Sequence, residues 1–185
     1  MYSPDRYVQA MRFAAARHNT QKEPGHDLPY LVHLVSVAAE VIAALPTTKL
    51  ADPDLAVTCA LLHDTVEDTV KTDEERARLV DEIVAKFGPA VSAGVAALSK
   101  DEKLPTKAEQ MADSLRRIRE QPPEIAVVKL ADRITNLSEP PHYWSKEKCG
   151  AYRQEAILIA DTLGYASAIL DARLRTRAEA YKAFC

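Results

Sequence analysis

Apolar residues recur at spacings of three and four along almost the whole chain, and no segment alternates convincingly with a period of two. This spacing is typical of amphipathic helices, whereas half-buried strands alternate between apolar and polar residues. The composition agrees, because only 5 of the 185 residues are glycine and 6% are aromatic. We therefore predict an all-α protein, a helical bundle of about eight or nine helices.

Capping residues and helix breakers set the expected helix boundaries. Ser3-Pro4 and Asp52-Pro53 each combine an N-cap with a proline in the first turn. Residues 72–75 have the form of a capping box, and Gly88 suits the left-handed position that ends a helix. The expected helices are about 4–18, 30–44, 53–64, 73–87, 89–98, 106–120, 124–137, 146–163 and 165–183.

A chain of 185 residues suits one domain with its own hydrophobic core. It contains no internal repeat, no low-complexity segment and no convincing domain boundary. We therefore predict a single domain over residues 1–185. Its core would span about residues 5–140, and C-terminal helices over about residues 146–184 would pack on that core.

Charge and hydropathy argue against several classes of partner. The net charge of −3 argues against a general nucleic-acid-binding protein, which would normally be basic. No stretch approaches 18 consecutive apolar residues, and the N-terminus lacks the apolar core of a signal peptide. Cys59, Cys149 and Cys185 show no CxxC spacing. We expect a cytoplasmic protein without a nucleic-acid or membrane partner, and self-association into a homo-oligomer stays open.

Ionisable residues occur where the pattern predicts buried helix surface. The apolar run that ends at Leu62 continues directly into His63-Asp64, and Glu67-Asp68 follows within one turn. His33 and Asp132 are each a single polar residue in an apolar helical segment. Buried charges are costly unless they are paired or bind a metal, and imidazole and carboxylate groups are good ligands for divalent cations.

Each of these residues also has an ordinary explanation when it is taken alone. A single histidine on an apolar face is more often a core or surface residue than a metal ligand. Asp132 can cap a helix or pair with Arg133, and Glu67-Asp68 can be a solvated helix end. Their joint occurrence in the order H…HD…D favours one shared cation site on three converging helices.

This order and its local wording resemble the HD-domain phosphohydrolases, and most closely the hydrolase domain of the Rel/SpoT homologues, including the small stand-alone alarmone hydrolases. PYLVHLVSVA resembles their PYI-x-HP-x-x-VA segment, and ALLHDTVEDT contains their HDTVEDT motif unchanged. FGPAVSAGVAALSK resembles FG-x-x-V followed by V-T-K, and VKLADRITNL resembles KLADR-x-x-N. The similarity covers roughly residues 10–140.

The resemblance implies an all-helical HD domain that binds one metal ion per chain, typically Mn²⁺. The implied metal ligands are His33, His63, Asp64 and Asp132. Glu67 and Asp68 are implied to act on the catalytic water, and Asn136 to line the nucleotide site. The implied reaction removes the 3′-pyrophosphate from a guanosine tetra- or pentaphosphate alarmone, so the expected partner is a phosphorylated purine nucleotide.

A phosphate-rich substrate needs cationic side chains despite the acidic total charge. The candidates are residues near the expected site or in the loops around it, namely Arg17, Lys22, Lys100, Lys103 and Arg133. For all of them except Arg133, an ordinary surface position is at least as good an explanation. Two other functions also stay open: a general HD nucleotidase or phosphodiesterase, and a non-catalytic HD module that binds a nucleotide or a partner. The intact ligand set and Glu67-Asp68 count against the non-catalytic alternative.

One motif departs from the family pattern. The guanosine-alarmone hydrolases usually carry H-x-x-Q-x-R-K before the PYI segment, and their arginine stacks on guanine. A gapless match starting at His18 places Glu23 and Pro24 at the arginine and lysine positions. A carboxylate cannot cover a base as a planar guanidinium does. The sequence therefore predicts that the adenosine analogue of the alarmone is hydrolysed at least as well as the guanosine form.

Overall fold

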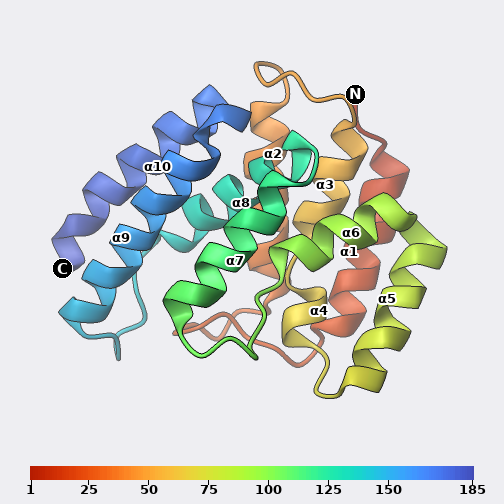
Figure 1. The fold of residues 1–185 in the computed structure, drawn as a ribbon, viewed down its shortest axis with the longest axis horizontal. Coiled ribbons are helices and arrows are strands. Elements are labelled where there is room, and N and C mark those ends of the chain that lie inside the picture. Colours follow the sequence, from red (N-terminus) through yellow and green to blue (C-terminus); the bar gives the residue numbers. More distant parts are fainter.

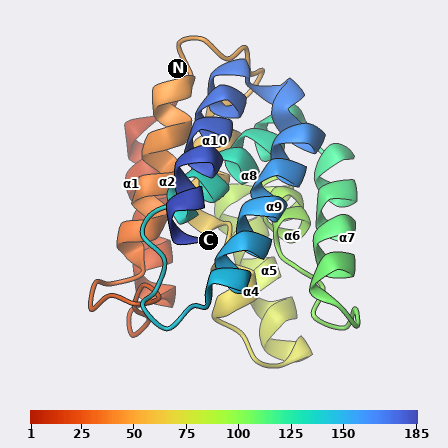
Figure 2. The same cartoon turned by 90° about the vertical axis from the view of Figure 1, so that its left-hand side faces the viewer.

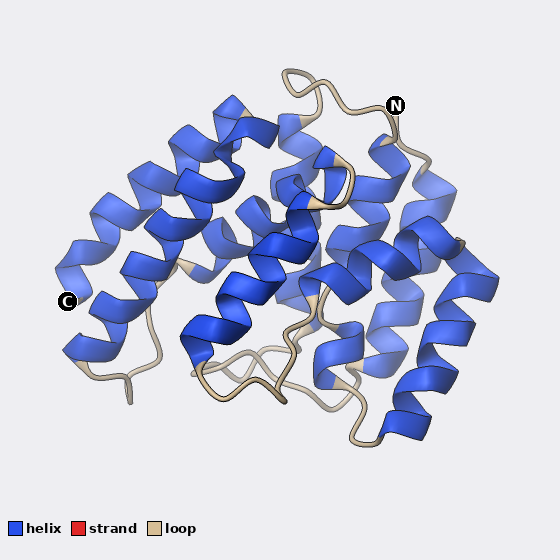
Figure 3. Cartoon of the chain, viewed as in Figure 1, coloured by secondary structure: helices blue, strands red, loops and turns tan.

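The computed structural model describes residues 1–185, which form helices and loops without a β-strand (Figures 1 and 3). The α-helices are α1 (Pro4–Arg17), α2 (Leu31–Ala44), α3 (Pro53–Leu62), α4 (Thr65–Asp68), α5 (Asp73–Phe87), α6 (Pro89–Leu98), α7 (Lys107–Arg119), α8 (Pro123–Asn136), α9 (Lys146–Leu163) and α10 (Ala168–Ala180). Two short 3-10 helices, η1 (Gly164–Ala166) and η2 (Tyr181–Phe184), flank α10. Since α4 is a single turn, the number of longer helices agrees with the prediction, and the all-α fold class is confirmed.

Helices α3 and α8 form the centre of the molecule, as Figures 1 and 2 show. Every residue of α3 from Leu55 to Leu62 is buried, and so is every residue of α8 from Glu124 to Ile134. A helix that is buried on all sides needs neighbours on all sides. Helices α1, α2 and α6 supply them around α3, while α2, α9 and α10 pack against α8.

The capping predictions explain where most helices begin. The Ser3 side chain accepts a hydrogen bond from the amide of Arg6, and the Asp52 side chain accepts one from the amide of Leu55. Both halves of the Thr72–Glu75 capping box are formed. These contacts satisfy backbone donors that the helices themselves leave unpaired.

Gly88 has a different conformation from the one expected. Its φ of 91° is positive, but its ψ of 165° lies outside the left-handed helical region. The next residue, Pro89, begins α6 immediately. Because proline pushes the residue before it towards extended ψ values, Gly88 both ends α5 and redirects the chain into α6.

Two predicted helices are interrupted in the structure. The expected helix over residues 165–183 is divided into η1, α10 and η2, because the Ser167 hydroxyl accepts from the amide of Leu170 and starts a new helix there. The expected helix over residues 53–64 ends at Leu62, and α4 restarts at Thr65. No helix combines the length and the apolar character needed to cross a membrane.

Two helical glycines provide a matched test of the core packing. A Cβ atom added at Gly94 would lie 2.5 Å from Ile125 Cδ1 and 2.9 Å from Cys59 Sγ, whereas one added at Gly150 would meet nothing within 4 Å. We expect Gly150→Ala to raise the free energy of unfolding by about 0.5–1 kcal/mol, the usual gain in helix propensity. Gly94→Ala should give a value about 1–3 kcal/mol below that of Gly150→Ala, because it overpacks the core. Urea denaturation measures both. Equal effects would mean that Cys59 on α3 and Ile125 on α8 can make room for the methyl group without a loss of stability.

Candidate metal centre and adjoining cleft

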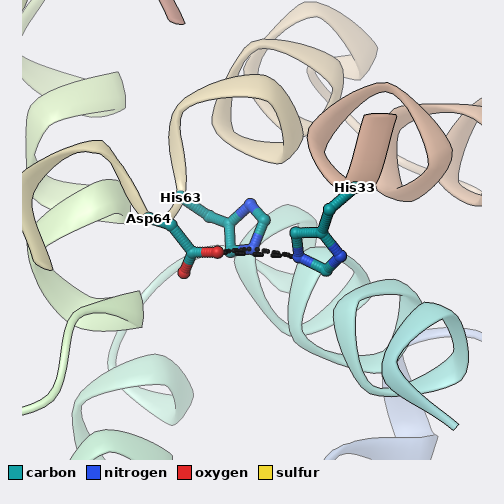
Figure 4. A group of neighbouring side chains, drawn as sticks. All are labelled: His33, His63 and Asp64. Carbon is teal, nitrogen blue, oxygen red and sulfur yellow. Dashed lines mark hydrogen bonds and ion pairs between the residues drawn. The ribbon is translucent and has the colours of Figure 1, made fainter. Parts of the chain in front are cut away.

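The predicted metal ligands come from three helical segments that meet at the centre of the fold. His33 is on α2, His63 and Asp64 form the junction between α3 and α4, and Asp132 is on α8. Figure 4 shows that His33, His63 and Asp64 turn their side chains towards one another. His33, His63 and Asp132 are each at most 5% exposed.

The ligand atoms lie at the separations expected around one ion. His63 Nε2 is 2.9 Å from Asp64 Oδ2 and 3.4 Å from His33 Nε2. Asp132 Oδ1 lies 3.5 Å from His33 Nε2 and 3.6 Å from His63 Nε2. Ligand atoms at about 2.1 Å from a common ion are roughly 3–3.5 Å apart. His33, His63 and Asp64 therefore form one candidate site for a divalent cation, and Asp132 lies beside it, within 3.6 Å of both imidazoles.

The break between α3 and α4 makes this convergence possible. Adjacent residues on a continuous α-helix point about 100° apart, so His63 and Asp64 would diverge if α3 simply continued. Instead α3 ends at Leu62, and Asp64 has φ −94° and ψ −4°. His63 Nδ1 lies 2.9 Å from the carbonyl oxygen of Ala60, and when Nδ1 carries the proton it donates to that oxygen. This contact leaves Nε2 free to face the site.

The pKa shifts of the cluster show that its surroundings favour positive charge on the imidazoles. Burial alone would raise the pKa of Asp64, but the neighbouring His63 and His33 hold it well below its usual range. Burial opposes charge on His63 as well, yet Asp64 and Asp132 raise its pKa well above the usual value. Without a cation, the carboxylates thus favour the protonated form of the imidazoles. A divalent ion can replace those protons, since metal binding to such ligands releases them.

Polar neighbours fix the orientation of both carboxylates. The Tyr30 hydroxyl donates to Asp64 Oδ2 at 2.5 Å, and Asn136 Nδ2 donates to Asp132 Oδ1 at 2.5 Å. Lys129 Nζ, buried on α8, donates to Asp132 Oδ2 at 2.9 Å. Partners of this kind hold metal ligands in one geometry. Tyr30 and Lys129 had no predicted role, although both lie within the segments that resemble the family motifs.

The two predicted catalytic acids lie at the edge of the cluster, on α4. Glu67 Oε2 accepts from the backbone amide of Lys100 at 2.8 Å, and Asp68 Oδ2 accepts from Gln21 Nε2 at 2.8 Å. Burial and the charge of Asp64 raise the pKa of Asp68 to about 6. Each acid therefore accepts a hydrogen bond from a loop: Glu67 from the loop after α6, and Asp68 from the loop between α1 and α2.

Gln21 also connects the loop to a buried histidine. Its Oε1 lies 2.6 Å from His18 Nδ1, and the His18 ring stacks on Tyr30 with centroids 5.2 Å apart. His18 and Gln21 are the first two motif residues of the H-x-x-Q-x-R-K match, although neither had a predicted role. They connect the end of α1 to both Asp68 and the Tyr30–Asp64 contact.

A cleft of about 530 Å³ adjoins the metal centre. Its lining includes the ligand His33 and the predicted nucleotide contact Asn136, together with residues of the 19–29 loop, the link after α8 and helices α9 and α10. Its aromatic side chains are Tyr30, Trp144, Tyr152 and Tyr181. This volume lies within the usual range for small-molecule sites, and aromatic rings provide surfaces on which a base can stack.

Two loops meet over this cleft. Gly25 has a φ of 83°, and a Cβ atom added there would lie 3.0 Å from Cα of Pro141. Only glycine combines that backbone conformation with such a close approach. Glu23 and Pro24, which stand at the family's arginine and lysine positions, both line the cleft.

Most of the basic residues predicted to bind substrate are engaged elsewhere. Lys22 Nζ lies 3.1 Å from Asp27, Lys103 Nζ lies 3.6 Å from Asp73, and Arg17 pairs with Glu82. None of these three residues lines the cleft. Lys100 stays beside the site, with its ammonium group 3.7 Å from Glu67 Oε1.

Arg133 also differs from the prediction. Its guanidinium pairs with Glu155 at 3.1 Å and lies 3.9 Å from the ring centroid of Tyr152, and the residue is buried. Because Arg133 points towards α9 rather than into the cleft, its direct role is to hold Tyr152 in place. Asn136 is the only predicted substrate contact that lines the cleft.

The geometry predicts that the protein retains about one divalent ion per chain. Asp64→Ala or His63→Ala should abolish retention, while Asp81→Ala, at an exposed position on α5, should not. An ion present at about 100 times its Kd adds about 2.7 kcal/mol to the free energy of unfolding, so chelation should lower the melting temperature. Metal analysis and thermal melts measure both quantities. About two ions per chain, or a melting temperature that chelation leaves unchanged, would contradict this site.

Comparisons with known proteins agree with this geometry. The family model described as HD domain matches residues 10–159. The chain is 28% identical to the Danio rerio guanosine-3′,5′-bis(diphosphate) 3′-pyrophosphohydrolase MESH1, over 91% of this chain and 89% of the relative. It is 30% identical to the Homo sapiens MESH1, over 84% of this chain and 83% of that protein.

A solved structure shares the fold. It is described as a metazoan orthologue of SpoT that hydrolyses ppGpp, and it matches 96% of both chains with a TM-score of 0.78 at 24% identity. The family match and the converging H…HD…D ligands lead to one conclusion: this chain belongs to the HD domain family and is a homologue of the MESH1 proteins.

Proposed function

We propose that the protein is a metal-dependent phosphohydrolase that releases pyrophosphate from the 3′ position of a purine-nucleotide alarmone. One observation carries the proposal: His33, His63, Asp64 and Asp132 lie close together, with Glu67 and Asp68 on the adjoining α4, and His33 also lines a cleft of about 530 Å³. The named activity of the MESH1 relatives supports the same reaction class.

Mn²⁺ is the cofactor that we propose, at one ion per chain. The donor set contains two imidazoles and two carboxylates and no thiolate. Carboxylate oxygens suit hard cations such as Mn²⁺, while imidazole nitrogens add affinity for first-row transition metals. When bound, such an ion supplies Lewis acidity to a phosphate oxygen and makes a water molecule more acidic.

The residues of the chain would then manage the protons of the reaction. With a pKa of about 6, Asp68 is largely ionised at neutral pH and can accept a proton from the attacking water. The water oxygen forms a bond to the phosphorus attached to the 3′-oxygen, the bond between that phosphorus and the 3′-oxygen breaks, and the 3′-oxygen takes up a proton. Glu67, held by the Lys100 amide, lies next to Asp68 and can share this proton transfer.

The role of Glu67 can be separated from metal binding. Glu67→Gln keeps the size of the side chain and removes its ability to take a proton. We expect kcat to fall by about two to four orders of magnitude, the usual effect of losing a general acid or base. Metal content should stay near that of the wild type, because Glu67 is not among the proposed ligands.

Glu74→Gln is the matched control, since Glu74 is exposed on α5 and away from the site. It should leave both kcat and metal content unchanged. Loss of the metal in Glu67→Gln would place Glu67 among the ligands and refute the proposed division of roles.

Base selectivity follows from the loop that lines the cleft. Glu23 lines the cleft at the family's arginine position, and Lys22 pairs with Asp27 instead of replacing that arginine. A stacking contact of this kind contributes about 1–3 kcal/mol per base, so its loss weakens guanosine binding. A carboxylate is an acceptor that can pair with the exocyclic amine of adenine, although the exocyclic amine of guanine is an alternative partner. We therefore propose that (p)ppApp, the adenosine alarmone, is a substrate at least as good as (p)ppGpp.

The measurement is kcat/KM for the two nucleotides under identical metal and salt conditions. We expect a ratio of adenosine to guanosine of one or more, and Glu23→Arg should shift the ratio towards guanosine. Glu23→Gln, which loses the charge without gaining a planar cation, is the control and should shift it less. A guanosine preference of about tenfold in the wild type, equivalent to about 1.4 kcal/mol, would overturn this proposal.

A further inference from the structure

Arg177 on α10 is the only arginine or lysine that lines the cleft. The cleft also contains the carboxylates of Glu23, Glu40 and Glu139. Arg177 is exposed and forms no salt bridge, whereas its neighbours Arg173 and Arg175 on the same helix are both paired. An unpaired guanidinium in an acidic cleft is available for an anionic ligand.

The position of α10 beside α2 places Arg177 relative to the metal centre. Ile169 and Leu170 at the start of α10 lie near Ala43 and Ala44 at the end of α2. One turn further along α10, Arg173 pairs with Glu40 through hydrogen bonds of 2.5 and 2.6 Å. The two helices therefore run in opposite directions along this contact.

The next turn of α10 carries Arg177 towards the start of α2. Arg177 and Tyr181 line the same cleft as Ser36 and the metal ligand His33. Each helical turn advances about 5.4 Å, and Ser36 is one turn before Glu40. Arg177 therefore lies about level with Ser36, close to one turn from His33, on the opposite wall of the cleft.

We propose that Arg177 binds the 5′-phosphates of the nucleotide whose 3′-pyrophosphate lies at the metal centre. This assignment rests on the proposed function, because it requires a nucleotide phosphorylated at both positions. A guanidinium binds phosphate through two parallel hydrogen bonds, which fixes direction as well as charge. Without Arg177, Glu23 and Glu139 would repel the 5′-phosphates.

The other cations near the cleft have contacts of their own and do not line it. Arg133 is buried against Tyr152 and Glu155, and Lys148 Nζ lies 4.0 Å from the ring centroid of Trp144 without lining the cleft. Lys22 is held by Asp27. Binding of the 5′-phosphates therefore depends on α10, beyond the segment that carries the metal ligands.

The test compares Arg177→Gln with wild type on two substrates: a nucleoside 5′-diphosphate 3′-diphosphate and the matching nucleoside 3′-diphosphate without 5′-phosphates. We expect kcat/KM of Arg177→Gln to fall about 10- to 100-fold on the first substrate, the usual cost of losing charged hydrogen bonds, and less than threefold on the second. Arg175→Gln is the matched control and should lose less than threefold on both, since Arg175 pairs with Asp161 and Asp171 at the surface. An equal loss on both substrates, or no loss on either, would overturn the assignment.

Calorimetric binding of ADP and GDP to the metal-loaded protein separates this inference from the proposed reaction. If wild type hydrolyses neither substrate, the proposed reaction fails, and the binding data then decide the role of Arg177 alone. Binding that weakens about 10-fold or more in Arg177→Gln, but not in Arg175→Gln, would support a 5′-phosphate site. If binding did not depend on Arg177, or if the wild type bound neither nucleotide, the proposed 5′-phosphate site would be refuted.

Discussion

The structure depends on neutralising charge at the centre of an apolar helical core. Asp64 and Asp132 bring two negative charges there, and Lys129 returns one positive charge by its contact with Asp132. The two carboxylates also raise the pKa of His33 and of His63. With neutral imidazoles, a divalent cation together with Lys129 and the two carboxylates would give one net positive charge. That excess suits a substrate rich in phosphate, because buried charges are stable only when they are paired.

The distribution of charge also distinguishes one side of the cleft from the other. Positive charge is concentrated at the metal centre and at Arg177, while Glu23 and Glu139 make the loop side acidic. Phosphates are attracted to the two positive positions, and the base is left to the aromatic and acidic surroundings. Arg173 neutralises Glu40 in this region, so Arg177 stays available. Orientation of a nucleotide thus follows from where the charges are paired and where they are not.

The features that could be predicted from the sequence are those that depend on local interactions. Ser3, Asp52 and Thr72 begin helices wherever they occur in suitable segments, and His33 and Asp132 are conspicuous in apolar runs. The break after Leu62 was missed because α3 continues an ordinary helical pattern up to the ligands. The partners of Arg17, Lys103 and Arg133 come from distant segments and could not be predicted, and the substrate-binding roles of these residues stay predictions. Arg177 carries no local signal at all. Cytoplasmic location and self-association stay predictions.

The contact between Gly25 and Pro141 joins two surface segments that differ from the helical core in how readily their residues can change. The proposed metal ligands lie on α2, on α8 and at the junction between α3 and α4, next to the buried core. The 19–29 loop and the link after α8 are surface segments that close over the cleft, and such segments tolerate change at little cost in stability. A lineage can therefore exchange one signalling nucleotide for another by altering a few loop residues, while its descendants keep the same reaction. Similarity in the core helices thus predicts the reaction of a relative better than it predicts the nucleotide that the relative hydrolyses.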